Sequence, residues 1–288
     1  ILNHIYHKIT MTLKEVKTVE VEGILCGKDP FFLISGPCVI EEDAVMMKTA
    51  ETLKEISERL KLPVIFKSSF QKDNRSSGEF FRGPSMEDGL SKLNEIKQKF
   101  NLPILSDVHH IEQIDPAAKV LDVIQIPAYL CMQTDLVEKA SSTGKVINIK
   151  HGQFISPDNM DKPVNKIKRL GNEKILLTER GYTFGYNDLI VDPRSFHIMR
   201  QIGYPVIFDI THSIRRYGIP SADPKGGNRE FLPALGRAGV GAGVDGIFIE
   251  SHPNPPKAKC DAASQMYLDQ LEEYLKPLIE INAIVKGI

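Results

Sequence analysis

Eight short apolar runs, separated by amphipathic stretches, constrain the fold of this chain more than any other feature. Each run is apolar at nearly every position, which is typical of a parallel strand that is covered on both faces. The runs are Phe31–Ser35, Val64–Lys67, Ile104–Val108, Val123–Pro127, Val146–Lys150, Ile175–Glu179, Val206–Ile210 and Gly246–Glu250.

The stretches between these runs have the spacing of helices. Asp43–Leu60 and Met86–Phe100 each place their apolar residues on one helical face. Further helices are expected to begin near Ile111, Gln133, Asn159, Arg194, Arg229 and Ser264. Eight strands alternating with eight helices predict a closed (β/α)8 barrel of the TIM type. An open doubly wound sheet fits less well, because Gly36-Pro37-Cys38 follows the first run where a GxGxxG turn would be expected.

The length of 288 residues suits either two small domains or one barrel. Without an internal repeat or a low-complexity linker, we predict one catalytic domain over residues 16–288. Its first part, residues 16–27, alternates in polarity and predicts a short β-hairpin that closes the bottom of the barrel. We interpret residues 1–15 as an N-terminal extension that could be disordered or derived from cloning, with Met11 as a plausible natural start.

Charge and cysteine content exclude several classes of protein. Lys and Arg (36) nearly balance Asp and Glu (37), so nucleic acid is not an expected partner. The sequence contains no run of 18 apolar residues, so a membrane-spanning helix is not expected. Residues 1–10 do not resemble a signal peptide. The four cysteines are irregularly spaced and do not predict a disulfide framework. We therefore expect a cytoplasmic protein.

Polar and reactive residues follow the ends of the predicted strands, whereas the strand starts show no such enrichment. In barrels of this kind the active site lies at the carboxyl ends of the strands. The sequence therefore predicts a polar ring at one end of the barrel. Its members are Cys38, Lys67, Lys72, Asn74, Arg75, Asp107, Gln125, Lys150, Arg180, His212 and Glu250.

Three cations come from three different strand ends: Lys72, Lys150 and Arg180. Converging on one mouth, they suit a small, highly anionic ligand such as a phosphorylated carboxylate. The alternative is that Lys150 and Arg180 form structural ion pairs with Glu179 or Asp107. Each residue alone favours the alternative, but the three together favour a binding site.

Cys38, His212, Glu250 and Asp261 form a second group. A thiolate, an imidazole and two carboxylates suit Zn²⁺, Fe²⁺ or Mn²⁺, and in a closed barrel the first strand lies beside the eighth. The alternative for Cys38 is a small buried apolar residue, and for His212 a core or capping histidine.

These residues, in this order, resemble a known family. KSSFQKDNRSS (67–77) is similar to the K-[AS]-S-[FY]-x-K-A-N-R-[ST]-S signature of the 3-deoxy-D-manno-octulosonate 8-phosphate synthases. Further matching motifs are SGPCVIE (35–41), IQIPAYL (124–130), NIKHGQF (148–154), FDITHS (208–213) and FIESHP (248–253). The related 3-deoxy-7-phosphoheptulonate synthases carry K-P-R-T-S at the second strand, so Asn74-Arg75-Ser76 indicates the octulosonate branch.

The resemblance implies a reaction and roles for the site residues. Phosphoenolpyruvate would condense with D-arabinose 5-phosphate and water, releasing phosphate, in lipopolysaccharide biosynthesis. The alternatives are a heptulosonate synthase that uses erythrose 4-phosphate, or a catalytically weakened binding homologue. The residues implied to be catalytic are Lys67, Lys72, Asn74, Asp107 and His212. Those implied to bind substrate are Lys72, Gln125, Lys150 and Arg180 for phosphoenolpyruvate, and Asn74, Arg75 and Ser76 for the sugar phosphate.

The resemblance also bears on the metal and on assembly. Metal-independent members carry Asn at the position of Cys38, so this chain resembles the metal-dependent class, with Cys38, His212, Glu250 and Asp261 as ligands and no organic cofactor. The family's cross-subunit site implies a homotetramer. Met132 stands where the family usually has an Arg that reaches the sugar phosphate across the subunit contact. We hypothesise that Arg215 or Arg216 takes over that role.

Overall fold

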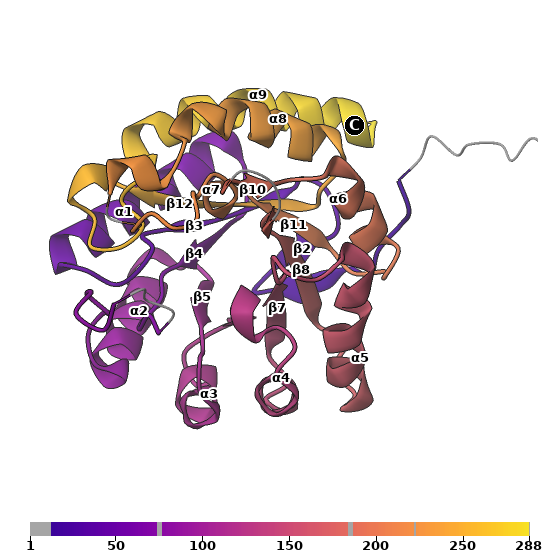
Figure 1. The fold of residues 1–288 in the computed structure, drawn as a ribbon, viewed down its shortest axis with the longest axis horizontal. Coiled ribbons are helices and arrows are strands. Elements are labelled where there is room, and N and C mark those ends of the chain that lie inside the picture. The colour runs from indigo at the N-terminus through magenta and orange to yellow at the C-terminus, as the bar shows by residue number, and fades with distance from the viewer. Residues whose placement is uncertain (1–12, 74–76, 184–186, 222, 288) are drawn as a thin grey trace, which may run out of the picture.

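Eight parallel strands pair in sequence order and close into a barrel, as predicted (Figure 1). The structure is a computed structural model that describes residues 13–73, 77–183, 187–221 and 223–287. Pairing of β12 with both β11 and β3 completes the ring. The barrel strands are β3 (Phe32–Gly36), β4 (Val64–Lys67), β5 (Ile104–Asp107), β6 (Val123–Ile126), β7 (Val146–Lys150), β8 (Ile175–Glu179), β11 (Val206–Asp209) and β12 (Gly246–His252).

Helices surround the strands, and α8 and α9 lie side by side against the same side of the barrel (Figure 1). The longer helices are α1 (Asp43–Leu60), α2 (Met86–Phe100), α3 (Ile111–Ala118), α4 (Thr134–Ser142), α5 (Asp161–Arg169), α6 (Pro193–Arg200), α8 (Leu232–Gly241) and α9 (Leu271–Lys286). One start was wrong: the last helix begins at Leu271 and not near Ser264. The strand β13 (Met266–Tyr267) and a 3-10 turn precede it, because β13 pairs with the end of β12.

The helices are held by their apolar faces. In α1, the residues Met46, Ala50, Leu53 and Ile56 are buried, at the spacing that places them on one side of the helix. They join a large core between helices and strands. The helix ends at Lys61, which adopts a left-handed conformation (φ 52°) and donates its backbone N–H to the Ser57 carbonyl.

The predicted N-terminal hairpin consists of β1 (Val19–Val21) and β2 (Ile24–Cys26), paired antiparallel. Val19, Val21 and Cys26 are buried against the lower interior of the barrel. The interior residues in this layer are Phe32, Ile34, Ile65, Leu105, Val123, Val146, Leu176, Ile207 and Phe248, one or two from each strand. The hairpin therefore closes the amino-terminal end of the barrel. The predicted extension, residues 1–15, lies mostly outside the described residues.

The carboxyl end of the barrel carries additional short elements. The hairpin of β9 (Tyr182–Thr183) and β10 (Leu189–Ile190) follows β8, and the four-residue helix α7 (Ile210–Ser213) follows β11 directly. The sequence did not predict these elements. In the part of the chain that the structure describes, no helix combines the length and apolar character needed to cross a membrane.

Candidate active site

The interior of the barrel changes from apolar to polar toward the carboxyl ends of the strands. Because side chains alternate along a strand, the residue two positions after each apolar interior residue also points inward. These second residues are Lys67, Asp107, Gln125, Asn148, Thr178, Asp209 and Glu250, and all are buried. Lys150 and Arg180 extend the pattern by one more step on β7 and β8. The members of the predicted polar ring that lie on the strands thus form the upper half of the barrel interior.

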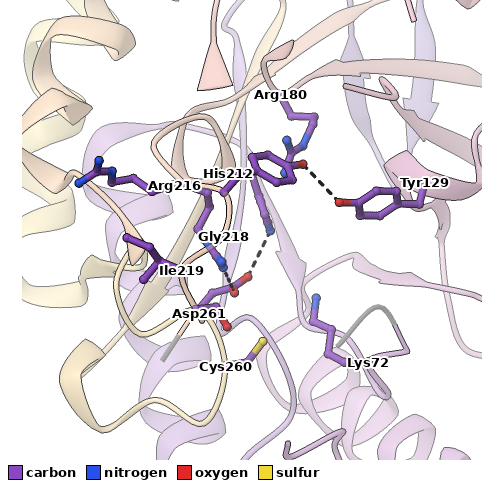
Figure 2. Close-up of a pocket in the computed structure, with 12 residues that line it drawn as sticks. Lys72, Tyr129, Arg180, His212, Arg216, Gly218, Ile219, Cys260 and Asp261 are labelled. Carbon is purple, nitrogen blue, oxygen red and sulfur yellow. Dashed lines mark hydrogen bonds and ion pairs between the residues drawn. The ribbon is translucent and has the colours of Figure 1, made fainter. Parts of the chain in front are cut away.

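The four predicted metal ligands lie in two adjoining groups that share Asp261. His212 Nε2 is 3.5 Å from Asp261 Oδ2 and 3.7 Å from Glu250 Oε1, and His212 and Asp261 face each other in Figure 2. The Cys38 thiol donates to Asp261 Oδ2 at 3.4 Å. Cys260 brings a second buried thiol within 4.8 Å of the Cys38 and Asp261 ligand atoms.

The surroundings of these donors fit a divalent cation. Asp209 Oδ2 accepts a hydrogen bond from His212 Nδ1 at 2.6 Å, which leaves Nε2 directed at the carboxylates. Glu250 Oε2 is buried and has no hydrogen-bond partner among the described residues. A carboxylate oxygen in that situation is costly unless a cation or donor satisfies it. Thiol, imidazole and carboxylate donors together suit Zn²⁺, Fe²⁺ or Mn²⁺.

The thiol of Cys38 is neutral in this environment without an added positive charge. Burial raises its pKa well above the usual value, and the neighbouring Cys260 and Asp261 act in the same direction. A cation bound beside the sulfur would favour the thiolate instead, because metal binding displaces the proton. The small cluster that Cys38 forms with Val39 and Cys260 also agrees with the alternative of an apolar packing role.

Three buried lysines occupy the wall beside this cluster. Lys67 Nζ contacts Glu250 Oε1 at 2.6 Å, and Lys72 Nζ lies 4.0 Å from Asp107 Oδ2. Lys150 forms a close ion pair with Asp209. The alternative interpretation paired Lys150 and Arg180 with Glu179 or Asp107. In the described structure, Lys150 pairs with Asp209 instead.

Ion pairing keeps most of these groups charged despite their burial. Burial opposes the charge of Lys72, but Asp107 and the other acidic groups around it together raise the pKa of Lys72 well above the usual value. Burial likewise raises the pKa of Asp107, but Lys72 and His109 hold it well below its usual range. Lys150 is different: burial lowers its pKa to about 8, the cations Arg180 and Lys67 act in the same direction, and Asp209 compensates only in part.

A pocket of about 250 Å³ opens above these groups and is lined by residues from several loops (Figure 2). Among the described residues that line it, Lys72, Arg180, Arg215 and Arg216 are four cations, against one carboxylate, Asp261. Arg180 Nη1 is buried without a hydrogen-bond partner among the described residues, so it is available to a ligand. The pocket therefore suits an anionic ligand next to the metal-ligand cluster.

Not every predicted site residue lines this pocket. Lys67 and Gln125 lie deeper in the barrel, where Gln125 accepts a hydrogen bond from Asn148 at 2.9 Å. Asn74, Arg75 and Ser76 lie outside the described residues.

Two residues are central to the geometry: Asp209, to which the sequence assigned no role, and Arg215, one of the two arginines hypothesised to bind the sugar phosphate. Asp209 joins Lys150 to His212, and Arg215 contacts Asp261. The alternation rule alone would have found Asp209, since it follows the interior residue Ile207 by two positions. No local signal indicates the partner of Arg215.

Comparison with known proteins decides the family. A sequence profile described as the DAHP synthetase I family matches residues 9–287, nearly the whole chain. The chain belongs to the DAHP synthetase I family. Among members of known name, the 2-dehydro-3-deoxyphosphooctonate aldolase of Geotalea daltonii is 52% identical over 272 residues, covering 94% of this chain and 100% of that protein.

Two further relatives have the same name. The protein of Pelobacter propionicus is 51% identical over 271 residues, and that of Geobacter sulfurreducens is 50% identical over 271 residues. Each match covers 94% of this chain and 99% of the relative. The resemblance to octulosonate synthases that the sequence motifs indicated is confirmed.

Proposed function

We propose that this chain is a 3-deoxy-D-manno-octulosonate 8-phosphate synthase, which condenses phosphoenolpyruvate with D-arabinose 5-phosphate and water. The observation that carries the proposal is the identity of about 50%, over nearly the full length, to relatives named 2-dehydro-3-deoxyphosphooctonate aldolase. The cationic pocket supports it, because both substrates are phosphate esters. The product would feed lipopolysaccharide synthesis in the cytoplasm.

The arrangement of cations accounts for substrate binding. Lys72, Lys150 and Arg180 would hold the phosphate and carboxylate of phosphoenolpyruvate, with Lys67 and Gln125 supporting them from below. Asn74, Arg75 and Ser76 would hold the sugar phosphate. Neutralising both anions lets them approach face to face, and fixing them in that position removes much of the entropic barrier.

The bond changes follow from that geometry. C3 of phosphoenolpyruvate attacks the aldehyde carbon of the sugar, and a water oxygen adds at C2. The bond between C2 and the ester oxygen then breaks, so phosphate leaves and C2 becomes a ketone. Of the two protons of the water, one ends on the new hydroxyl group of the sugar chain and the other is released with phosphate. Asp107, held by Ser69 and Lys72, would organise the site during these steps.

We propose Cys38, His212, Glu250 and Asp261 as the ligands of a divalent metal, with no organic cofactor. When bound, such a metal supplies Lewis acidity that orients and polarises an oxygen ligand. Nδ1 of His212 carries the proton that it donates to Asp209, so Nε2 is the nitrogen that would bind the metal. We also propose a homotetramer, in line with the family's cross-subunit site.

One assay tests the function. Phosphate release is measured with phosphoenolpyruvate and either arabinose 5-phosphate or erythrose 4-phosphate, with and without added divalent metal. We expect turnover with the five-carbon sugar. Faster turnover with erythrose 4-phosphate would instead identify a heptulosonate synthase. Phosphoenolpyruvate binding without phosphate release from any aldose phosphate would identify a weakened homologue.

Of the two arginines that could replace the cation missing at Met132, the geometry favours Arg216. Arg215 is committed to Asp261, whereas Arg216 is 39% exposed and pairs at 3.1 Å only with Asp188, itself 41% exposed, among the described residues. Such an exposed ion pair contributes little to the stability of the fold, so Arg216 can exchange Asp188 for a phosphate.

We expect Arg216→Gln to raise the KM for arabinose 5-phosphate about tenfold, the effect of one charge-assisted hydrogen bond. The KM for phosphoenolpyruvate should stay the same. Initial rates at varied sugar concentration measure this. Arg194→Gln, which removes an exposed arginine paired with Asp192, is the control and should change neither constant. An unaltered sugar KM in Arg216→Gln would exclude this role.

The lowered pKa of Lys150 predicts a pH dependence. Lys150 is protonated below about pH 8 and loses its charge above it. We therefore expect kcat/KM for phosphoenolpyruvate, which reports the free enzyme, to be level below about pH 8 and to fall toward tenfold per pH unit above it. In Lys150→Arg the charge persists to higher pH, so the decline should disappear from this range. A decline of the same shape in both proteins would assign it to another group.

A further inference from the structure

Arg215 connects the pocket to the metal-ligand cluster. Its Nη1 donates to Asp261 Oδ1. The other oxygen of the same carboxylate, Oδ2, faces Cys38 Sγ at 3.4 Å and His212 Nε2 at 3.5 Å. The two oxygens of Asp261 therefore have separate partners: one binds the arginine, and the other faces the remaining candidate ligands.

Arg215 is itself fixed by the loop that precedes α8. Its Nε donates to the Gly226 carbonyl at 3.1 Å, and its backbone forms an isolated antiparallel bridge with Gly227. A Cβ at Gly227 would lie 2.9 Å from the Ala263 carbonyl, in the turn that carries Asp261. Glycine at this position thus permits the close approach that brings the arginine to the carboxylate.

The turn that carries Asp261 needs external support. Asp261 adopts a left-handed conformation (φ 48°), which is unusual for a residue other than glycine. Arg229 holds the following part of the turn by donating to the carbonyls of Ala262 and Gln265. Arg215 is the contact that fixes the Asp261 side chain on the side away from the cluster.

We infer that Arg215 is a positioning residue for a bound cation: by occupying Asp261 Oδ1, it directs Oδ2 alone toward the cluster. The inference depends on the proposed metal site. A carboxylate that is already oriented need not lose rotational freedom when the metal binds, and losing an outer-shell hydrogen bond of this kind typically costs 10- to 100-fold in metal affinity. We expect this loss in Arg215→Ala.

The test is a titration of the full-length, chelator-treated protein with Co²⁺. The thiolate-to-cobalt absorption band reports ligation by a cysteine, for which Cys38 is the proposed residue, and competition with a chelator of known affinity gives the Kd. We expect the wild type to develop the band and Arg215→Ala to bind 10- to 100-fold more weakly. Millimolar guanidinium, which can occupy the vacated position through the pocket, should restore most of the affinity. Arg216→Gln, altered at the adjacent residue but not in contact with Asp261 among the described residues, should bind like the wild type.

Each other outcome has a definite meaning. Equal or tighter binding by Arg215→Ala would overturn the inference, and so would a weakening that guanidinium does not reverse, since that would assign the effect to the loop. A wild-type protein without the cobalt band would contradict the proposed metal site itself, which separates the two failures. If Arg215→Ala does not fold by circular dichroism, Arg215→Gln is measured against the same expectations.

Discussion

Removing the metal with a strong chelator is expected to lower the condensation rate by about 10³-fold or more, equivalent to about 4 kcal/mol of barrier. Adding Zn²⁺, Fe²⁺ or Mn²⁺ should restore it. The reason is that the donor groups form two overlapping triads that share Asp261, one with Cys38 and Cys260 and one with His212 and Glu250. In addition, Glu250 Oε2 is buried without a hydrogen-bond partner among the described residues. Phosphate release and elemental analysis on the same samples provide the measurement.

Variants of the cysteines separate ligation from packing. Cys38→Ala should reproduce the loss of activity and retain little metal. Cys131→Ala removes another fully buried thiol, one that lies outside the candidate cluster, and should retain both metal and activity. Undiminished activity of the chelated wild type, with no metal detectable, would leave Cys38 with a structural role only.

Asp209→Asn is expected to reduce kcat/KM by about 10²- to 10³-fold. Removing one partner of a buried ion pair leaves the other charge uncompensated, which costs about 3–5 kcal/mol. Here one carboxylate contacts both Lys150 and His212 Nδ1, and Asp209 Oδ1 accepts the His212 backbone N–H at 2.9 Å. The KM for phosphoenolpyruvate should rise and the affinity for the metal should fall in the same variant.

The matched control for this change is Asp245→Asn. Asp245 is also buried and ion-paired, with Arg200 at 2.5 Å and Lys286 at 3.0 Å, but it precedes β12 at the opposite end of the barrel. The Asp245→Asn substitution should lower the melting temperature of the protein and leave kcat/KM unchanged. An Asp209→Asn protein with the kinetic constants of the wild type would show that Lys150 and His212 do not need their shared partner.

The barrel could be predicted from the sequence because its evidence is local. Each strand is a separate run of apolar residues, and all eight runs lie within one or two residues of the observed strands. The start of α9 was missed because β13 exists only through its pairing with β12. Residues 266–267 are too few to show an alternating or apolar run, so the local pattern does not reveal this strand.

The candidate site likewise has features that the local sequence predicts and others that depend on the folded barrel. Strand ends predicted that Lys72, Lys150 and Arg180 converge on one mouth. Lys72 and Arg180 do line the pocket, whereas Lys150 is buried and is not among its lining residues. The strand ends did not indicate which charges pair, because partners such as Arg215 and Asp261 are 46 residues apart in the chain and meet only after the barrel closes. Predicting such pairs requires the positions of the loops, which no periodicity in this sequence provides.

The hairpin β1–β2 has a consequence for how the enzyme exchanges its reactants. Because the hairpin closes the amino-terminal end of the barrel, reactants and products pass through the opening at the carboxyl ends of the strands. Both products therefore leave through the opening by which both reactants enter.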